Sequence, residues 1–440
     1  MENFVDVGFF QNNDCFLVKH LYILYSLCGA YCYEKYVRFK FRCFIIILLC
    51  YAYFRCTAPQ IKVIILHAQL QHVFQASGQL IYINFVLAML CTLYWKRKEF
   101  HRLFDLLKEK RDNLVVTFDS ENQEQDHYLK ETNISKIHFT VYFTLIAIYL
   151  VVYFGKLFDI LIREGGKTSL QIDPQFDFFI PFFCDDCNTW SSYFLAFNFS
   201  YICGAVSGTI FVAILFLLHV LLIHLENRAG VLQNDIRYHS HSMMAKLEEY
   251  SRDEDDEMKK KRPNTLKLTS IKQQRDEHIE EYMVKVVQWI KMHQHLMRLI
   301  KQYQKCAESV SGLVTGNSLF SIIFFGYFVI SFVMDQDDLA PLYLPYGMIH
   351  FTILLICCNI GSSLNDLSDI VSNAVYSMPW YYFPVKDQKT ILNFLALSQP
   401  TQHLNVFGFL SLNLEMFPHI LNDVYGHMQT LRLLVNRHRN

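Results

Sequence analysis

The stretch Asn405–Val435, NVFGFLSLNLEMFPHILNDVYGHMQTLRLLV, is largely apolar and long enough to span a bilayer with some tilt. It is nevertheless too polar for a helix surrounded by lipid. At helical spacing one face carries Glu415, His419, Asp423, Gly426, Thr430 and Leu434. Ionisable side chains inside a membrane are costly unless they face water, a partner or a pathway. This face therefore predicts either a polar seam between packed helices or the wall of an aqueous ion path. Pro418 predicts a bend in the same helix.

Six further apolar runs precede this stretch, in a chain of 440 residues that is 52% hydrophobic and has a net charge of −1. A net charge this close to zero provides no electrostatic attraction for nucleic acid. The sequence predicts an all-α polytopic membrane protein with one membrane domain over residues 1–440. The seven predicted transmembrane helices cover residues 38–56, 61–95, 137–162, 191–224, 306–334, 344–362 and 402–435.

The basic residues predict the orientation of these spans. More than half of the 40 Lys and Arg residues lie in 96–136 and 225–305, the loops after the second and fourth spans. Since Lys and Arg concentrate in cytoplasmic loops, we expect a cytoplasmic N-terminus and an extracellular C-terminus, opposite to a G-protein-coupled receptor. Residues 251–275 are so charged that they predict a flexible cytoplasmic insertion, with a calmodulin-binding or nucleic-acid-binding segment as the alternative.

The outer ends of the second, third, fourth and sixth spans could converge on a pocket. Aromatic walls with a few polar groups suit a small, mostly apolar ligand. The alternative is that these aromatic side chains are ordinary core residues. The candidate ligand-binding residues are His72, Phe74, Gln75, Tyr149, Tyr153, Phe197, Tyr201, Tyr343, Tyr346 and His350.

Motifs of catalysis do not occur in the sequence. It has no Gly-rich phosphate loop, no His-Glu-x-x-His and no nucleophile elbow, so we predict no enzyme activity and no cofactor. Cys184 and Cys187 form a Cys-Asp-Asp-Cys pair without further metal ligands nearby, which predicts a disulfide or two free thiols rather than a metal site.

An ion path along the last helix would require several copies around an axis, because one helix cannot enclose a pore. Glu415 and Asp423 would then form rings of negative charge that favour cations. Thr430 and Leu434, near the outer end, could form the constriction.

Several residues in the last 80 positions resemble the C-terminal signature of the insect odorant receptor family. They are Gly361, Ala374-Val-Tyr376, Trp380, Ser398-Gln-Pro400, Leu414-Glu415-x-Phe417, Ile420-Leu421, Tyr425 and Leu431-Arg432. The resemblance implies a tetrameric, odorant-gated, non-selective cation channel in the plasma membrane of a sensory neuron dendrite. The ending differs from that of the shared co-receptor subunit, which implies a divergent tuning subunit that assembles with the co-receptor as a heterotetramer.

The resemblance also implies roles for particular residues. The last helix would line the pore, with the gate at Thr430 and Leu434. Residues 361–400, with Tyr376 and Trp380, would form a cytoplasmic anchor between subunits together with parts of 225–305. The sequence departs from the family at Thr430, where an aliphatic residue is typical, and at His427-Met428, where Tyr-Phe is typical.

Three other functions fit the sequence less well. A metabotropic receptor needs the opposite orientation. A secondary transporter often shows inverted repeats, and none is convincing in this sequence. A gustatory-type channel of the same superfamily is disfavoured by the region around Trp380.

Overall fold

The computed structural model describes residues 190–260, 264–335, 340–408 and 410–439, together with helix α5 (Arg97–Lys108) and scattered helical positions between 61 and 162. Over these residues the fold is predominantly helical, as the sequence predicts. The long helices are α8 (Trp190–Met258), α9 (Thr265–Asp335) and α10 (Ala340–Tyr376). The short 3-10 helix η2 (Trp380–Tyr382), α11 (Val385–Ser398), strands β1 (Leu404–Val406) and β2 (Leu410–Leu412), and α12 (Phe417–Arg439) complete the chain.

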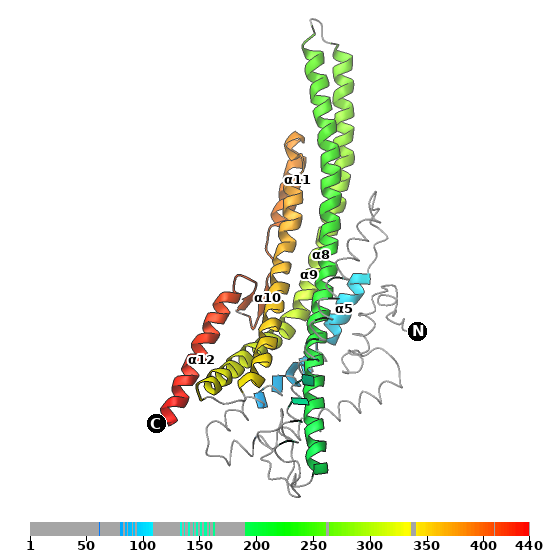
Figure 1. The fold of residues 1–440 in the computed structure, drawn as a ribbon. Helices are drawn as coiled ribbons and strands as arrows, with labels where there is room; N and C mark the ends of the chain where they lie inside the picture. Colours follow the sequence, from blue (N-terminus) through cyan, green and yellow to red (C-terminus); the bar gives the residue numbers. More distant parts are fainter. Residues whose placement is uncertain are drawn as a thin grey trace, which may run out of the picture.

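Helices α8 and α9 form an antiparallel hairpin that extends well beyond α11 (Figure 1). The 69 residues of α8 contain no proline and give a rod of about 100 Å at 1.5 Å per residue. Buried residues recur at intervals of three or four along both helices, as in a coiled coil. On α8 they include Leu232, Ile236, Met243 and Leu247, and on α9 they include Ile279, Tyr282, Val286 and Trp289.

The expectation of a flexible insertion at 251–275 is wrong for most of its length. Residues 251–258 continue α8 and residues 265–275 belong to α9. Near the tip of the hairpin, where apolar residues are few, polar pairs hold α8 and α9 together. Tyr250 Oη lies 3.3 Å from His278 Nδ1, and an Arg275 guanidinium nitrogen lies 3.1 Å from Glu254 Oε1.

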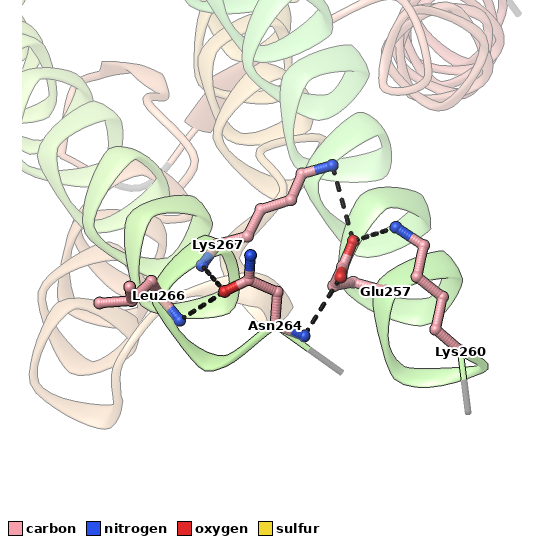
Figure 2. Close-up of polar contacts among 5 residues, drawn as sticks. All are labelled: Glu257, Lys260, Asn264, Leu266 and Lys267. Carbon is pink, nitrogen blue, oxygen red and sulfur yellow. Dashed lines mark hydrogen bonds and ion pairs between the residues drawn. The ribbon is translucent and has the colours of Figure 1, made fainter. Parts of the chain in front are cut away.

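The tip of the hairpin is closed by a second polar group (Figure 2). The almost inaccessible carboxylate of Glu257 accepts hydrogen bonds from Lys260 Nζ and from the backbone N–H of Asn264, the latter at 3.2 Å. Asn264 Oδ1 in turn accepts from the backbone N–H groups of Leu266 (3.1 Å) and Lys267 (3.3 Å), so it caps the N-terminus of α9. The hydrogen bond from Lys260 lowers the pKa of Glu257. Glu257 and Asn264 thus hold the end of α8 beside the start of α9.

Three helical stretches among the described residues are long and apolar enough to cross a membrane. They are Ile214–Met258, Thr265–Tyr327 and Gly347–Tyr382, which belong to α8, α9 and the α10 region. Their facing surfaces share one core that includes Leu218, Tyr303 and Leu354. The first and second predicted spans, and the third, fall mostly outside the described residues.

The boundary of the last predicted span, 402–435, requires a correction. Strands β1 and β2 pair antiparallel, with Leu404 opposite Leu412, and α12 begins only at Phe417. Leu404 and Val406 are buried on alternate positions of β1, as in a strand. Pro418 is the second residue of α12, where its missing N–H is tolerated, so it belongs to the start of the helix rather than to a bend within it.

The β1–β2 hairpin turns at Phe407 and Gly408, which have φ angles of 55° and 77°. This left-handed conformation is costly for phenylalanine and natural for glycine. The Phe407 ring packs over two glycines of α9: a methyl group built on Gly312 would lie 3.5 Å from it and one built on Gly316 3.2 Å. The hairpin therefore packs against α9 at two positions that carry no side chain.

Candidate functional site: the polar face of α12

Helix α12 lies on the α9–α10 side of the molecule, away from the α8 rod (Figure 1). Its packed face is narrow. Ile420 and Val424 are buried, and Met428 is half-buried beside Gly326 of α9. The Phe417 ring makes an edge contact with Phe351 of α10, with ring centroids 5.3 Å apart. These residues follow one another at spacings of three or four, which places them on one side of the helix.

The side of α12 that carries the predicted polar residues is exposed in the single chain. His419, Asp423, Gly426 and Thr430 are all exposed, as is Glu415. Glu415, however, lies in the turn before α12 and not on the helix, because the helix starts two residues later. Leu434 lies within α12, and its side chain is outside the described set.

The hydroxyl of Thr430 is already hydrogen-bonded within the helix. Thr430 Oγ1 donates to the carbonyl oxygen of Gly426, one turn earlier, at 2.9 Å. A threonine bonded back to the helix in this way satisfies its polar group locally. The position is therefore less polar than its residue type indicates, which reduces the departure from an aliphatic residue.

A second exposed group lies at the turn between α10 and α11. This aromatic turn comprises Tyr376, Trp380, Tyr381 and Tyr382, of which Tyr376 is 68% and Trp380 39% exposed. Phe383 anchors the turn, because its ring lies 5.3 Å from that of Tyr282 on α9 and is buried. Exposed aromatic clusters on a rigid support are typical of protein interaction surfaces.

The comparisons with known proteins identify the family. A family model described as the seven-transmembrane odorant receptor, "7tm Odorant receptor", matches residues 69–425. The chain belongs to this family. It is accordingly a membrane-embedded receptor, and the family consists of receptors and channels rather than enzymes.

The receptor also resembles solved structures of the insect olfactory receptor OR5 from Machilis hrabei. The structure of OR5 in complex with eugenol superposes with a TM-score of 0.67 and 13% identity, covering 94% of this receptor and 97% of OR5. A second OR5 structure gives a TM-score of 0.66 and 13% identity over 97% and 99% of the two chains. At this identity the similarity demonstrates a shared fold. No curated protein matches the sequence.

The predicted ligand pocket of the receptor is described at one side chain. His350 of α10 is buried and its ring stacks on Phe325 of α9, with centroids 6.3 Å apart. Phe197 and Tyr201 lie in α8 and Tyr343 and Tyr346 in α10, but their side chains are outside the described set. The remaining predicted pocket residues lie wholly outside the described residues; they are His72, Phe74, Gln75, Tyr149 and Tyr153. The pocket stays a prediction.

Sequence reasoning missed a set of buried polar residues in α9. Thr315, Asn317, Ser318 and Ser321 are each no more than 2% exposed. Within the described structure, neither polar atom of the Asn317 side chain has a hydrogen-bond partner. An unpaired buried amide is costly, and polar residues retained inside a membrane segment indicate a functional position. The signal was the run Gly316-Asn-Ser318 inside an apolar stretch.

The described residues of the receptor include no group of three or more His, Cys, Asp or Glu side chains that could hold a metal ion. Cys184 and Cys187 are outside the described residues. The cysteines whose side chains the structure describes, Cys91, Cys306, Cys357 and Cys358, are free thiols.

Proposed function

We propose that this receptor is the odorant-binding tuning subunit of a ligand-gated, non-selective cation channel whose pore is lined by α12. The observation that carries the proposal is the contrast between the two sides of α12. Ile420 and Val424 are buried, whereas His419, Asp423 and Thr430 are exposed in the single chain. A polar surface of this kind is stable in a membrane only against water or a partner.

A pore formed by several copies of α12 satisfies this requirement. Around a central axis, Asp423 and the preceding Glu415 would form rings of carboxylates that attract cations. Because the Thr430 hydroxyl is bonded to Gly426, the methyl group of Thr430 is available, with Leu434, for a dry constriction near the outer end. The orientation expected from the basic loops puts this constriction on the extracellular side.

The aromatic turn is the proposed contact between subunits on the cytoplasmic side. Tyr376 and Trp380 combine large apolar area with polar edges, the combination that dominates interface energetics. The proposed partner is a shared co-receptor subunit, giving a heterotetramer in the plasma membrane of a sensory neuron dendrite.

The proposed ligand is a small volatile odorant bound among the outer ends of the spans. The OR5 relative was solved in complex with eugenol, a small aromatic compound, which supports this ligand class. Opening follows if the odorant binds the open conformation more tightly than the closed one, because binding then shifts the population toward the open state.

The test is whole-cell recording from cells that express the receptor with the co-receptor during a broad odorant panel. We expect an odorant-evoked cation current, and Asp423→Asn should change its conductance or its divalent-to-monovalent permeability ratio. Asp369→Asn, which removes an exposed carboxylate from α10, is the matched control and should change neither.

A cysteine pair tests the assignment of the lining face. Asp423→Cys should react with a charged, water-soluble thiol reagent and lose current. Tyr425→Cys lies about 160° around the same helix, at 100° per residue, and should retain current. Surface-expressed receptor that carries no current but drives a second-messenger response to odorants would refute the channel and the proposed orientation together.

A further inference from the structure

The start of α12 is joined to α10 by an unusually close backbone contact. A methyl group built on Gly361 of α10 would lie 1.9 Å from the carbonyl oxygen of Leu412 and 2.7 Å from its carbonyl carbon. Leu412 is the last residue of β2 and is fully buried. The backbone of β2 thus lies directly on the backbone of α10, and only glycine leaves room for it.

A hydrogen bond secures the next part of the chain to the same turn of α10. The backbone N–H of Leu414 donates to Ser362 Oγ at 2.8 Å. From this point the chain turns into α12, and the N–H of Met416 donates to Asn413 Oδ1 at 2.7 Å. Gly361 and Ser362 therefore fix the segment 412–414 just before the helix begins. We call these two residues and that segment the α10 joint.

The same helix also reaches the region of the predicted pocket. Helix α10 is continuous from Ala340 to Tyr376 and includes the predicted pocket residue His350. Gly361 follows eleven residues later, about 17 Å along the axis. Phe351, beside His350, makes the edge contact with Phe417 at the start of α12. Helix α10 therefore contacts the chain around the start of α12 at two positions along its length, Phe351 and Gly361.

Two hydrogen bonds attach the chain that precedes the β1–β2 hairpin, and they do not involve the segment leading into α12. Ser368 Oγ donates to the carbonyl oxygen of Pro400 at 2.9 Å, and Gln304 Nε2 donates to that of His403 at 2.9 Å. These bonds hold the connection from α11 to β1. The α10 joint differs because it acts on the segment that leads into α12.

We propose that Gly361 and Ser362 are positioning residues that transmit a displacement of α10 to the base of α12. This inference rests on the proposed function, in which α12 lines the pore. A shift of α10 on ligand binding moves Leu412 and Leu414 with it. The backbones of Gly361 and Leu412 are in direct contact, and the hydrogen bond from Leu414 to Ser362 opposes their separation. The start of α12 then moves as a unit with α10.

Recordings from the full receptor with the co-receptor test the joint, using maximal odorant-evoked current per surface-expressed receptor. Gly361→Ala should reduce this ratio at least tenfold, because the added methyl displaces β2. Gly347→Ala is the matched control on the same helix, since among the described residues its methyl would meet only Phe325 Cβ at 3.8 Å, an ordinary contact. It should stay within twofold of the wild type.

The serine provides a milder pair of variants that is informative even where Gly361→Ala does not reach the surface. Ser362→Ala should raise the half-maximal odorant concentration by threefold or more, whereas Ser362→Thr, which keeps the hydroxyl, should behave as the wild type. Ser368→Ala, which loses the bond to Pro400, should leave it unchanged.

Wild-type current with unchanged responses in both Gly361→Ala and Ser362→Ala would overturn the joint and leave the proposed function standing. Equal responses of Ser362→Ala and Ser362→Thr would likewise overturn it. Absence of current from the wild-type pair would refute the proposed function and this inference with it.

Discussion

Replacing Trp289 by phenylalanine should loosen the α8–α9 hairpin at its middle. Trp289 is 2% exposed, and its indole N–H donates to Asp235 Oδ2 at 2.6 Å. Its ring also lies edge-on to Tyr282, with centroids 5.5 Å apart, and is stacked near His239 at 6.1 Å. A single substitution therefore removes a hydrogen bond to a charged group and part of an aromatic cluster.

The expected cost follows from these contacts. A hydrogen bond to a charged group contributes about 1.5–3 kcal/mol. Asp235 keeps some contact with solvent, so water compensates it in part, and the ring cluster adds a smaller loss. We expect about 2 kcal/mol in the free energy of local opening, which corresponds to about 30-fold faster amide exchange.

Hydrogen–deuterium exchange of the purified receptor, read by mass spectrometry, measures this quantity for peptides from 232–250 and 279–293. Trp95→Phe is the matched control, because Trp95 is 84% exposed, and it should leave exchange unchanged. Asp235→Asn keeps an acceptor oxygen and should fall between the two. Hairpin exchange in Trp289→Phe at the wild-type rate would refute the assignment of Trp289 as a main support of the hairpin.

Two further predictions concern the same hairpin. Asn264→Ala removes the cap of α9 at a cost of about 1 kcal/mol, so amides of the first turn should exchange about fivefold faster while those near Trp289 do not change; equal exchange in Asn264→Ala and Asn264→Asp would contradict the cap. Burial against Phe394 lowers the pKa of His293 below its ordinary 6.5. His293 in the folded receptor therefore binds fewer protons than His293 in the unfolded chain. The receptor consequently loses stability as pH falls below about 6.5. The unfolding temperature should therefore drop between pH 7.5 and pH 5.5, and His293→Gln should make the drop smaller; an identical drop in both would contradict this role.

Hydrophobic pattern and residue type were enough to predict the helical class and apolar stretches of membrane-spanning length in α8, α9 and the α10 region. They failed at 251–275 because composition registers charge but not pairing across helices. Glu254 and Glu257 keep the spacing of the apolar residues before them. Glu254 pairs with Arg275 on α9, and Glu257 pairs with Asn264, the cap of α9. No local property of either segment reveals this.

The start of the last span was misplaced for a different reason. Between 404 and 412 an apolar run contains an alternation of period two, which a membrane-length window averages away. Phe407 holds a left-handed turn that its residue type disfavours, so only the packing against Gly312 and Gly316 identifies the hairpin. The sequence pattern consequently predicts Glu415 on a helix that in fact begins two residues later.

Because α8 is long and uninterrupted, a small tilt of this helix in the membrane produces a large displacement at its far end. The part from Leu225 to Met258 projects about 50 Å beyond the apolar portion of the helix at 1.5 Å per residue. A rotation of about 5° in the membrane, too small to break side-chain contacts there, would carry the tip through about 4 Å at that radius. A probe attached beside Met258 would thus report movements that are nearly invisible at the site where they begin.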